Sequence, residues 1–243
     1  MLLPTLITNT VGEKLDFTFH PGSKLDFLLI LGHGLTGNKD RPLLVALAQG
    51  LSARGWPCVR ISFSGNGDSE GHFEAATITK EVGDLKSILD KIPDSVQVAY
   101  AGHSMGSAVG VLTAANDKRI HGLISLAGMT YPAAFYAREF GSLIPGKDCM
   151  WDDPDCPLSV AFAEDMKSIE STLPAAASLL QPWLIIHGNA DDLVPVHDGK
   201  DAYNAAQSPK EWVEIENGAH SFDEASYLHI IDTIHCWLNT RFG

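Results

Sequence analysis

Short apolar runs alternate with amphipathic stretches along most of the chain. The runs are bounded by glycine, proline or polar residues, and runs of about four to eight residues are typical of buried strands. The expected strands cover Phe27–Leu31, Cys58–Phe63, Val96–Ala101, Ile120–Leu126, Trp183–His187 and Glu211–Ile215.

Between these strands, apolar residues recur at steps of three and four, which predicts helices with one buried face. The clearest series is Ile78, Val82, Leu85, Leu89 and Ile92. Residues 227–238 show the same spacing. Further helices are expected at 41–54 and 198–207, and at 105–115, where small residues predict close packing on the sheet. Strands that alternate with helices predict an α/β fold, in which a mostly parallel sheet carries helices on both faces.

Two segments depart from this alternation. Residues 6–19 hold two short alternating runs around Val11-Gly12-Glu13, which predict an antiparallel hairpin at the edge of the sheet. Residues 129–180 are interrupted by prolines and rich in aromatic side chains. We expect this second segment to be a cap inserted into a single domain that spans residues 1–243.

Composition and charge narrow the classes of partner. Hydrophobic residues make up 45% of the chain, which is typical of a globular protein. The net charge of −13 would repel phosphate backbones and anionic lipids, so neither nucleic acid nor a membrane is an expected partner. Residues 1–10 lack the features of a signal peptide, so we expect a cytoplasmic protein, either a monomer or a homodimer.

The four cysteines show no metal-ligand spacing. Cys58 and Cys236 lie in apolar segments and are predicted to be buried free thiols. Cys149 and Cys156 flank a short loop and could pair, which the sequence leaves open.

The motif G-x-S-x-G, which presents a nucleophilic serine on a strand-to-helix turn, occurs twice. Ser104, in Gly102–Gly106, follows an expected strand and opens an expected helix. Ser69, in Gly67–Gly71, follows a Gly/Asn loop and precedes no helical pattern. Ser104 is therefore the predicted nucleophile, and Ser69 is interpreted as a turn residue.

A serine nucleophile needs a base and a group that orients the base. His220 follows the last expected strand and is the predicted base. Asp191 or Asp192 follows the strand before it, and spacing does not decide between these neighbours. Of two later aspartates, Asp198 is interpreted as a helix cap and Asp223 as a helix-start carboxylate.

An acyl-transfer site also needs donors for the developing oxyanion. The amide of Met105, which follows the nucleophile, is one expected donor, and the Gly-rich loop 32–37 is expected to provide a second. Expected substrate contacts are Gly34, His103 and three cap aromatics, Tyr131, Phe135 and Trp151.

These segments resemble the α/β-hydrolase superfamily over essentially the whole chain. Within it, the chain is similar to the capped serine aminopeptidase-like group, which includes cinnamoyl and feruloyl esterases, acylglycerol lipases and carboxylesterases. The matching segments are HGLTGNKD (33–40), FSGNGDSEG (63–71), GHSMG (102–106), HGNADDLVP (187–195) and GAHSF (218–222). The resemblance implies that Asp191 is the acid, that Leu35 supplies the second oxyanion amide, and that the loop containing Ser69 is not catalytic.

The expected function is therefore a serine ester hydrolase, such as a carboxylesterase of the cinnamoyl or feruloyl type, that acts on a small-molecule ester without a metal or organic cofactor. The acidic composition disfavours anionic substrates such as acyl-CoA. Two alternatives stay open: an amidase or aminopeptidase with the same triad, and a non-catalytic scaffold.

Overall fold

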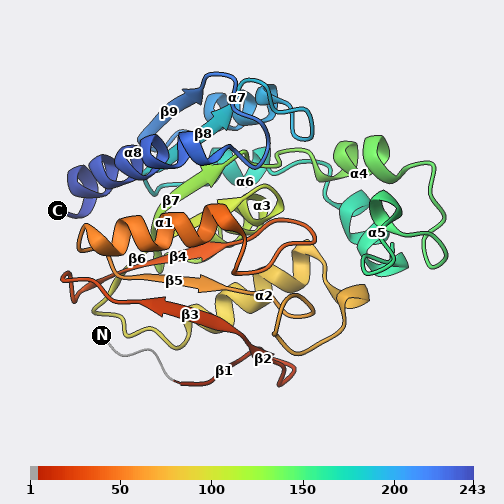
Figure 1. The fold of residues 1–243 in the computed structure, drawn as a ribbon, viewed down its shortest axis with the longest axis horizontal. Coiled ribbons are helices and arrows are strands. Elements are labelled where there is room, and N and C mark those ends of the chain that lie inside the picture. The colour runs from red at the N-terminus through yellow and green to blue at the C-terminus, as the bar shows by residue number, and fades with distance from the viewer. Residues whose placement is uncertain (1–4) are drawn as a thin grey trace.

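A computed structural model describes residues 5–243 of the protein. Seven strands form the main sheet in the order β3-β5-β4-β6-β7-β8-β9 (Figure 1). β3 (Phe17–His20) is antiparallel to its neighbour β5 (Cys58–Ile61), and all other neighbours are parallel. The remaining strands are β4 (Phe27–Gly32), β6 (Gln97–His103), β7 (Ile120–Leu126), β8 (Trp183–Gly188) and β9 (Lys210–Ile215). The predicted α/β class is confirmed.

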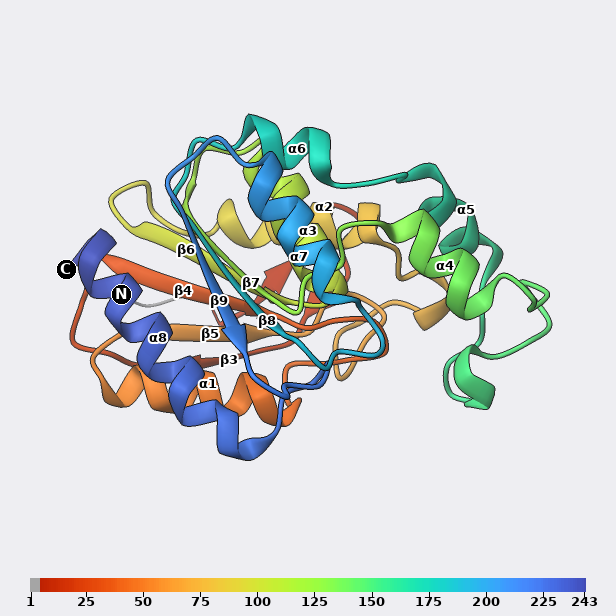
Figure 2. The same ribbon diagram turned by 90° about the horizontal axis from the view of Figure 1, so that it is seen from above.

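Helices cover both faces of this sheet (Figure 2). α1 (Pro42–Ala53) and α8 (Glu224–Phe242) pack on one face. The other face carries α2 (Ile78–Leu89), α3 (Met105–Ala114), α6 (Leu173–Ser178) and α7 (Val196–Ala205). Because side chains of a strand alternate between faces, Leu28 and Ile30 of β4 join one buried cluster, and Leu29 and Leu31 join the other.

The N-terminal pairing was predicted correctly, but its place was not. β1 (Ile7–Thr8) and β2 (Lys14–Leu15) are antiparallel, but they form a separate two-stranded sheet, and β3 is the edge strand of the main sheet. The Asn9 amide donates to Asp84 of α2 over 2.9 Å and so holds this small sheet against the helix. Sequence periodicity reports that a strand is amphipathic but not which element it meets.

The segment between β7 and β8 stands beyond the ends of the strands (Figure 1). It begins with α4 (Pro132–Phe140) and α5 (Val160–Ser168), joined through the 3-10 helix η2 (Met150–Asp152). Phe140 is fully buried among aromatic rings, the nearest being that of Trp151 with centroids 4.9 Å apart. α6 then returns to the sheet beside α3 and α7. A second 3-10 helix, η1 (Phe73–Ala75), precedes α2 and contacts α5.

The two later aspartates lie at different positions of their helices. Asp223 lies at the start of α8, as predicted, and caps this helix by accepting a hydrogen bond from the Ser226 amide. Asp198 is not a cap, because Pro195 occupies that position of α7. The Asp198 carboxylate is buried and accepts the Thr130 amide over 3.0 Å, which ties the start of the 129–180 segment to α7.

All four thiols are free in the structure, including those of Cys149 and Cys156. Cys58 is buried as predicted, but the prediction for Cys236 is wrong, because this residue is exposed. Trp237 and Leu238, which follow it in α8, are buried, so the apolar composition around Cys236 belongs to the opposite face of the helix. Within residues 5–243, no helix combines the length and apolar character needed to cross a membrane.

Candidate active site

Ser104 occupies the turn between β6 and α3 in a strained backbone conformation, with φ 55° and ψ −121°. A side chain at Gly102 would clash with the carbonyl of Gly106, and one at Gly106 would clash with the carbonyl of His33. Glycine at both positions therefore lets the strand and the helix meet at a sharp angle. A serine in this geometry is lifted to the end of the strand, where its hydroxyl can be reached.

A chain of two hydrogen bonds joins Ser104, His220 and Asp191. His220 Nε2 is 2.9 Å from Ser104 Oγ, and His220 Nδ1 is 2.8 Å from Asp191 Oδ2. Because an ionised carboxylate only accepts, Nδ1 carries the ring proton and Nε2 is left as the acceptor for the serine hydroxyl. The structure thus brings together the three residues predicted to act as nucleophile, base and acid.

Asp191 is fixed more firmly than a surface carboxylate. Its Oδ1 accepts the amides of Leu193 and Val194 over 3.0 and 2.8 Å, and its side chain is fully buried. Burial alone would raise the pKa of Asp191, but hydrogen bonds from His187 and His220 hold that pKa well below its ordinary value. The neighbouring Asp192 is exposed, so the geometry favours Asp191 over Asp192.

Two further histidines support the site through hydrogen bonds but are not part of the chain from Ser104 to Asp191. His103 Nε2 lies 2.9 Å from the backbone oxygen of His220, and burial lowers the pKa of His103 to about 3. His33 accepts the Phe63 amide at Nε2 and contacts the Gly34 oxygen through Nδ1. Burial lowers the pKa of His33 to about 4, so both rings are neutral at pH 7 and serve as fixed hydrogen-bonding groups.

The Gly-rich loop after β4 lies directly against Ser104. A Cβ at Gly34 would be 2.8 Å from the Ser104 Cβ, so glycine permits this approach. The amides of Leu35 and Met105 have no hydrogen-bond acceptor among residues 5–243. They are therefore free to donate to an oxygen atom that enters beside Ser104.

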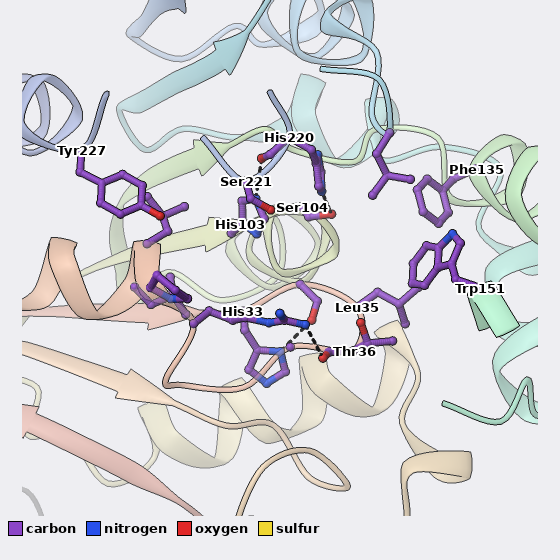
Figure 3. A pocket seen from close by; sticks show the side chains of 17 residues that line it. His33, Leu35, Thr36, His103, Ser104, Phe135, Trp151, His220, Ser221 and Tyr227 are labelled. Atoms are coloured by element: carbon purple, nitrogen blue, oxygen red, sulfur yellow. Dashed lines mark hydrogen bonds between the residues drawn. The ribbon is translucent and has the colours of Figure 1, made fainter. Parts of the chain in front are cut away.

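A cavity of about 460 Å³ opens over Ser104. Figure 3 shows Phe135 and Trp151 on one side of Ser104 and His220, and Tyr227 on the other. Gly34 and His103 line the cavity, as do the two cap aromatics just named.

One expected substrate contact is wrong. Tyr131 lies outside the cavity, and its hydroxyl donates to Asp201 Oδ2 over 2.8 Å. Conversely, the cavity has lining residues that sequence reasoning missed because they belong to the starts of α1 and α8 or to connecting loops. They include Arg41, Leu43, Leu44, Leu193, Ser221 and Tyr227. Ser221 follows His220 directly, which is the single sequence signal among them.

Ser69, in the second G-x-S-x-G, has a different environment. Its buried hydroxyl donates to the Ser62 carbonyl over 2.7 Å and accepts the Asp16 amide over 2.7 Å. These contacts tie the turn to the strands around it and agree with the interpretation of Ser69 as a turn residue. In the described part of the chain, no three His, Cys, Asp or Glu side chains cluster in a way that could hold a metal ion.

Comparison with known proteins places the chain in a family. The model described as "Serine aminopeptidase, S33" matches residues 24–146, and the chain belongs to this family of α/β hydrolases.

Individual relatives are distant. The chain is 26% identical over 202 residues to the uncharacterized protein YfhR of Salmonella typhi, covering 77% of this chain and 62% of that protein. It is 25% identical over 170 residues to the mitochondrial palmitoyl-protein thioesterase ABHD10 of Homo sapiens, covering 63% and 53%. The chain thus spans between about half and three fifths of the length of these relatives.

Among solved structures, Est1E from Butyrivibrio proteoclasticus with bound ferulic acid has a TM-score of 0.87 and 24% sequence identity. The match covers 98% of this chain and 99% of Est1E. At this identity the likeness shows that the two chains share a fold.

Proposed function

We propose that the protein is a serine hydrolase of carboxylic esters, with Ser104 as nucleophile, His220 as general base and Asp191 as the acid that orients it. The observation that carries the proposal is the hydrogen-bonded chain from Ser104 through His220 to Asp191, in which Ser104 and His220 line the cavity.

The reaction would proceed through an acyl-enzyme. Ser104 Oγ attacks the acyl carbon while its proton passes to His220 Nε2, and His220 then donates that proton to the departing alkoxide. A water molecule, deprotonated by His220, attacks the acyl-enzyme, and His220 returns that proton to Ser104 Oγ as the acid is released. The buried Asp191 carboxylate stabilises the positively charged imidazole that forms in each half of the cycle.

The free amides of Leu35 and Met105 are suited to the oxyanion of each tetrahedral intermediate. A donor placed in this way contributes about 3 kcal/mol to stabilisation of the transition state. The loop that carries Leu35 is held by the hydrogen bonds of His33 and by the Gly37 amide, which donates to the Gly34 carbonyl over 3.0 Å.

The cavity favours an ester over a peptide with a free amino terminus. An aminopeptidase needs a negative group to bind the substrate ammonium, but the described residues that line this cavity include no aspartate or glutamate. Phe135, Trp151 and Leu193 instead provide an apolar wall suited to an aliphatic or aryl group. The ferulic acid bound to Est1E, a protein of the same fold, agrees with an aryl substrate of the cinnamoyl type.

A substrate comparison tests the proposal. We expect hydrolysis of 4-nitrophenyl butyrate and methyl cinnamate, and little or none of an amino-acid 4-nitroanilide. A folded protein that cleaves the anilide faster than both esters would contradict the ester assignment and favour the amidase. Absence of turnover on every ester and amide would favour the non-catalytic scaffold.

A further inference from the structure

Arg41 differs from the other five arginines of the chain in its partners. Each of the five forms an ion pair with a carboxylate, namely Arg54–Asp232, Arg60–Asp40, Arg119–Asp117, Arg138–Glu139 and Arg241–Glu211. Arg41 forms none within residues 5–243. In a protein with 30 acidic residues and a net charge of −13, an arginine without a carboxylate partner calls for an explanation.

The position of Arg41 points to the active-site cavity. It is the residue before α1, lines the cavity over Ser104, and donates from Nη2 to the Thr36 carbonyl over 2.8 Å. This hydrogen bond holds the guanidinium beside the loop that carries the Leu35 amide. A guanidinium has five N–H donors, so most of those of Arg41 remain available to a bound molecule.

Neither the dipole of α1 nor its first turn stabilises the positive charge of Arg41. Helix N-termini carry a partial positive charge, which disfavours a cation, and the first turn of α1 has no acidic residue to offset it. Burial keeps the His33 and His103 rings neutral, and the positive charge of Arg41 lowers the pKa of both further. Arg41 is the one arginine or lysine among the described residues that line the cavity.

We propose that Arg41 binds a carboxylate of the substrate, so that the preferred substrates are esters that carry one negative charge. A single guanidinium matches a monoanion and can grip a carboxylate with two parallel hydrogen bonds. The acidic surface would oppose a dianion such as a phosphate monoester more strongly than a monoanion. This inference rests on the proposed esterase function and names its substrate class.

Net charge alone predicts that anionic substrates are disfavoured, but Arg41 places a positive group at the cavity itself. Net charge acts over long distances, and at physiological salt such interactions are largely screened beyond about 8 Å. A carboxylate in contact with Arg41 interacts at short range and can form two hydrogen bonds with the guanidinium, although Arg41 is exposed. A local positive group can therefore select an anion on an acidic protein.

Two pairs of esters test the proposal by placing the charge on either side of the ester bond. One pair is 3-acetoxybenzoate and 3-acetoxybenzamide, and the other is 4-nitrophenyl hydrogen adipate and 4-nitrophenyl hexanoate. In Arg41→Met, we expect the ratio of kcat/KM for the anionic to the neutral ester to fall at least about tenfold in one or both pairs, the size expected for a lost hydrogen bond to a charged group. The loss should lie mainly in KM, because the carboxylate is bound before and during reaction.

Arg54→Met is the matched control, because Arg54 lies at the other end of α1 and pairs with Asp232 at the surface. It removes the same charge and should leave both ratios unchanged. Arg41→Lys keeps the positive charge but lacks the planar pair of N–H donors. It should therefore retain part of the preference for the anionic esters.

Two results would overturn the proposal. An unchanged ratio of kcat/KM in both pairs would show that Arg41 does not bind the charged group of the substrate. An equal fall for anionic and neutral esters, mainly in kcat, would show that Arg41 only supports the Thr36 loop. Either result would leave the esterase assignment standing, whereas that assignment fails if the wild-type protein hydrolyses neither neutral ester.

Discussion

At the scale of single residues, Ser104 shows why a motif needs its surroundings. Ser104 and Ser69 sit in the same five-residue pattern, yet only Ser104 lies between a strand and a helix with a histidine on its hydroxyl. The strand before Ser104 could be predicted as a short apolar run, and the helix after it from its small residues. The contacts that define Ser69 as a turn residue join it to Ser62 and Asp16, and such contacts leave no trace in local sequence.

The choice between neighbouring aspartates is also a residue-scale question, and it gives a direct prediction. Asp191→Asn should lower kcat by about 10³–10⁴-fold, because an amide would present the wrong hydrogen-bonding group to His220 Nδ1. Asp192→Asn is the matched control and should stay close to wild type, since Asp192 is exposed. Steady-state kinetics on one ester measure both, and a loss confined to Asp192→Asn would refute the assignment of Asp191.

At the scale of elements, apolar patterns predict what is buried but not what it is buried against. The strands of the main sheet could be placed because most are short, continuous apolar runs, and helices such as α2 because apolar residues recur on one face. The partner of the N-terminal hairpin could not, since it depends on the contact between Asn9 and Asp84. The prediction that Cys236 is buried is wrong for a similar reason. The apolar neighbours that suggested burial lie on another face of α8.

The cavity walls show this limit most clearly. Phe135 and Trp151 could be predicted because aromatic residues in an irregular segment stand out. Arg41 and Tyr227 could not, because each belongs to the start of an otherwise ordinary helix, and only the packing of α1 and α8 on the same face brings them to the cavity. Specificity is therefore harder to predict than catalysis, whose residues lie at the ends of adjacent strands.

At the scale of the whole molecule, a buried acid on α2 links stability to pH. The side chain of Glu81 is 1% exposed, and its Oε2 has no hydrogen-bond partner in the described part of the chain. Burial, with the nearby charges of Asp84 and Asp165, raises the pKa of Glu81 well above its ordinary value. The folded protein thus keeps a proton that the unfolded chain releases above about pH 4.3. The stability from this group is present below that pH and is lost as pH rises towards the folded pKa.

Replacement of this acid should therefore stabilise the protein most at high pH. Glu81→Gln should raise the Tm at pH 8 by about 2–4 °C, the shift that about 1 kcal/mol produces in a protein of this size. The gain should shrink towards pH 5, because the unfolded chain then also binds the proton more often. Glu164→Gln, at an exposed position of α5, is the matched control. A gain of the same size at both pH values, or a loss at pH 8, would contradict the buried neutral state of Glu81.

The most direct test of the central claim is to locate the nucleophile by reaction with a serine-directed phosphonate. We expect one equivalent to bind at Ser104, identified by mass spectrometry of the digested protein, with loss of ester hydrolysis in proportion to labelling. Ser104→Ala should neither be labelled nor hydrolyse esters at a comparable rate. Labelling at Ser69, or a fully active Ser104→Ala variant, would contradict the account.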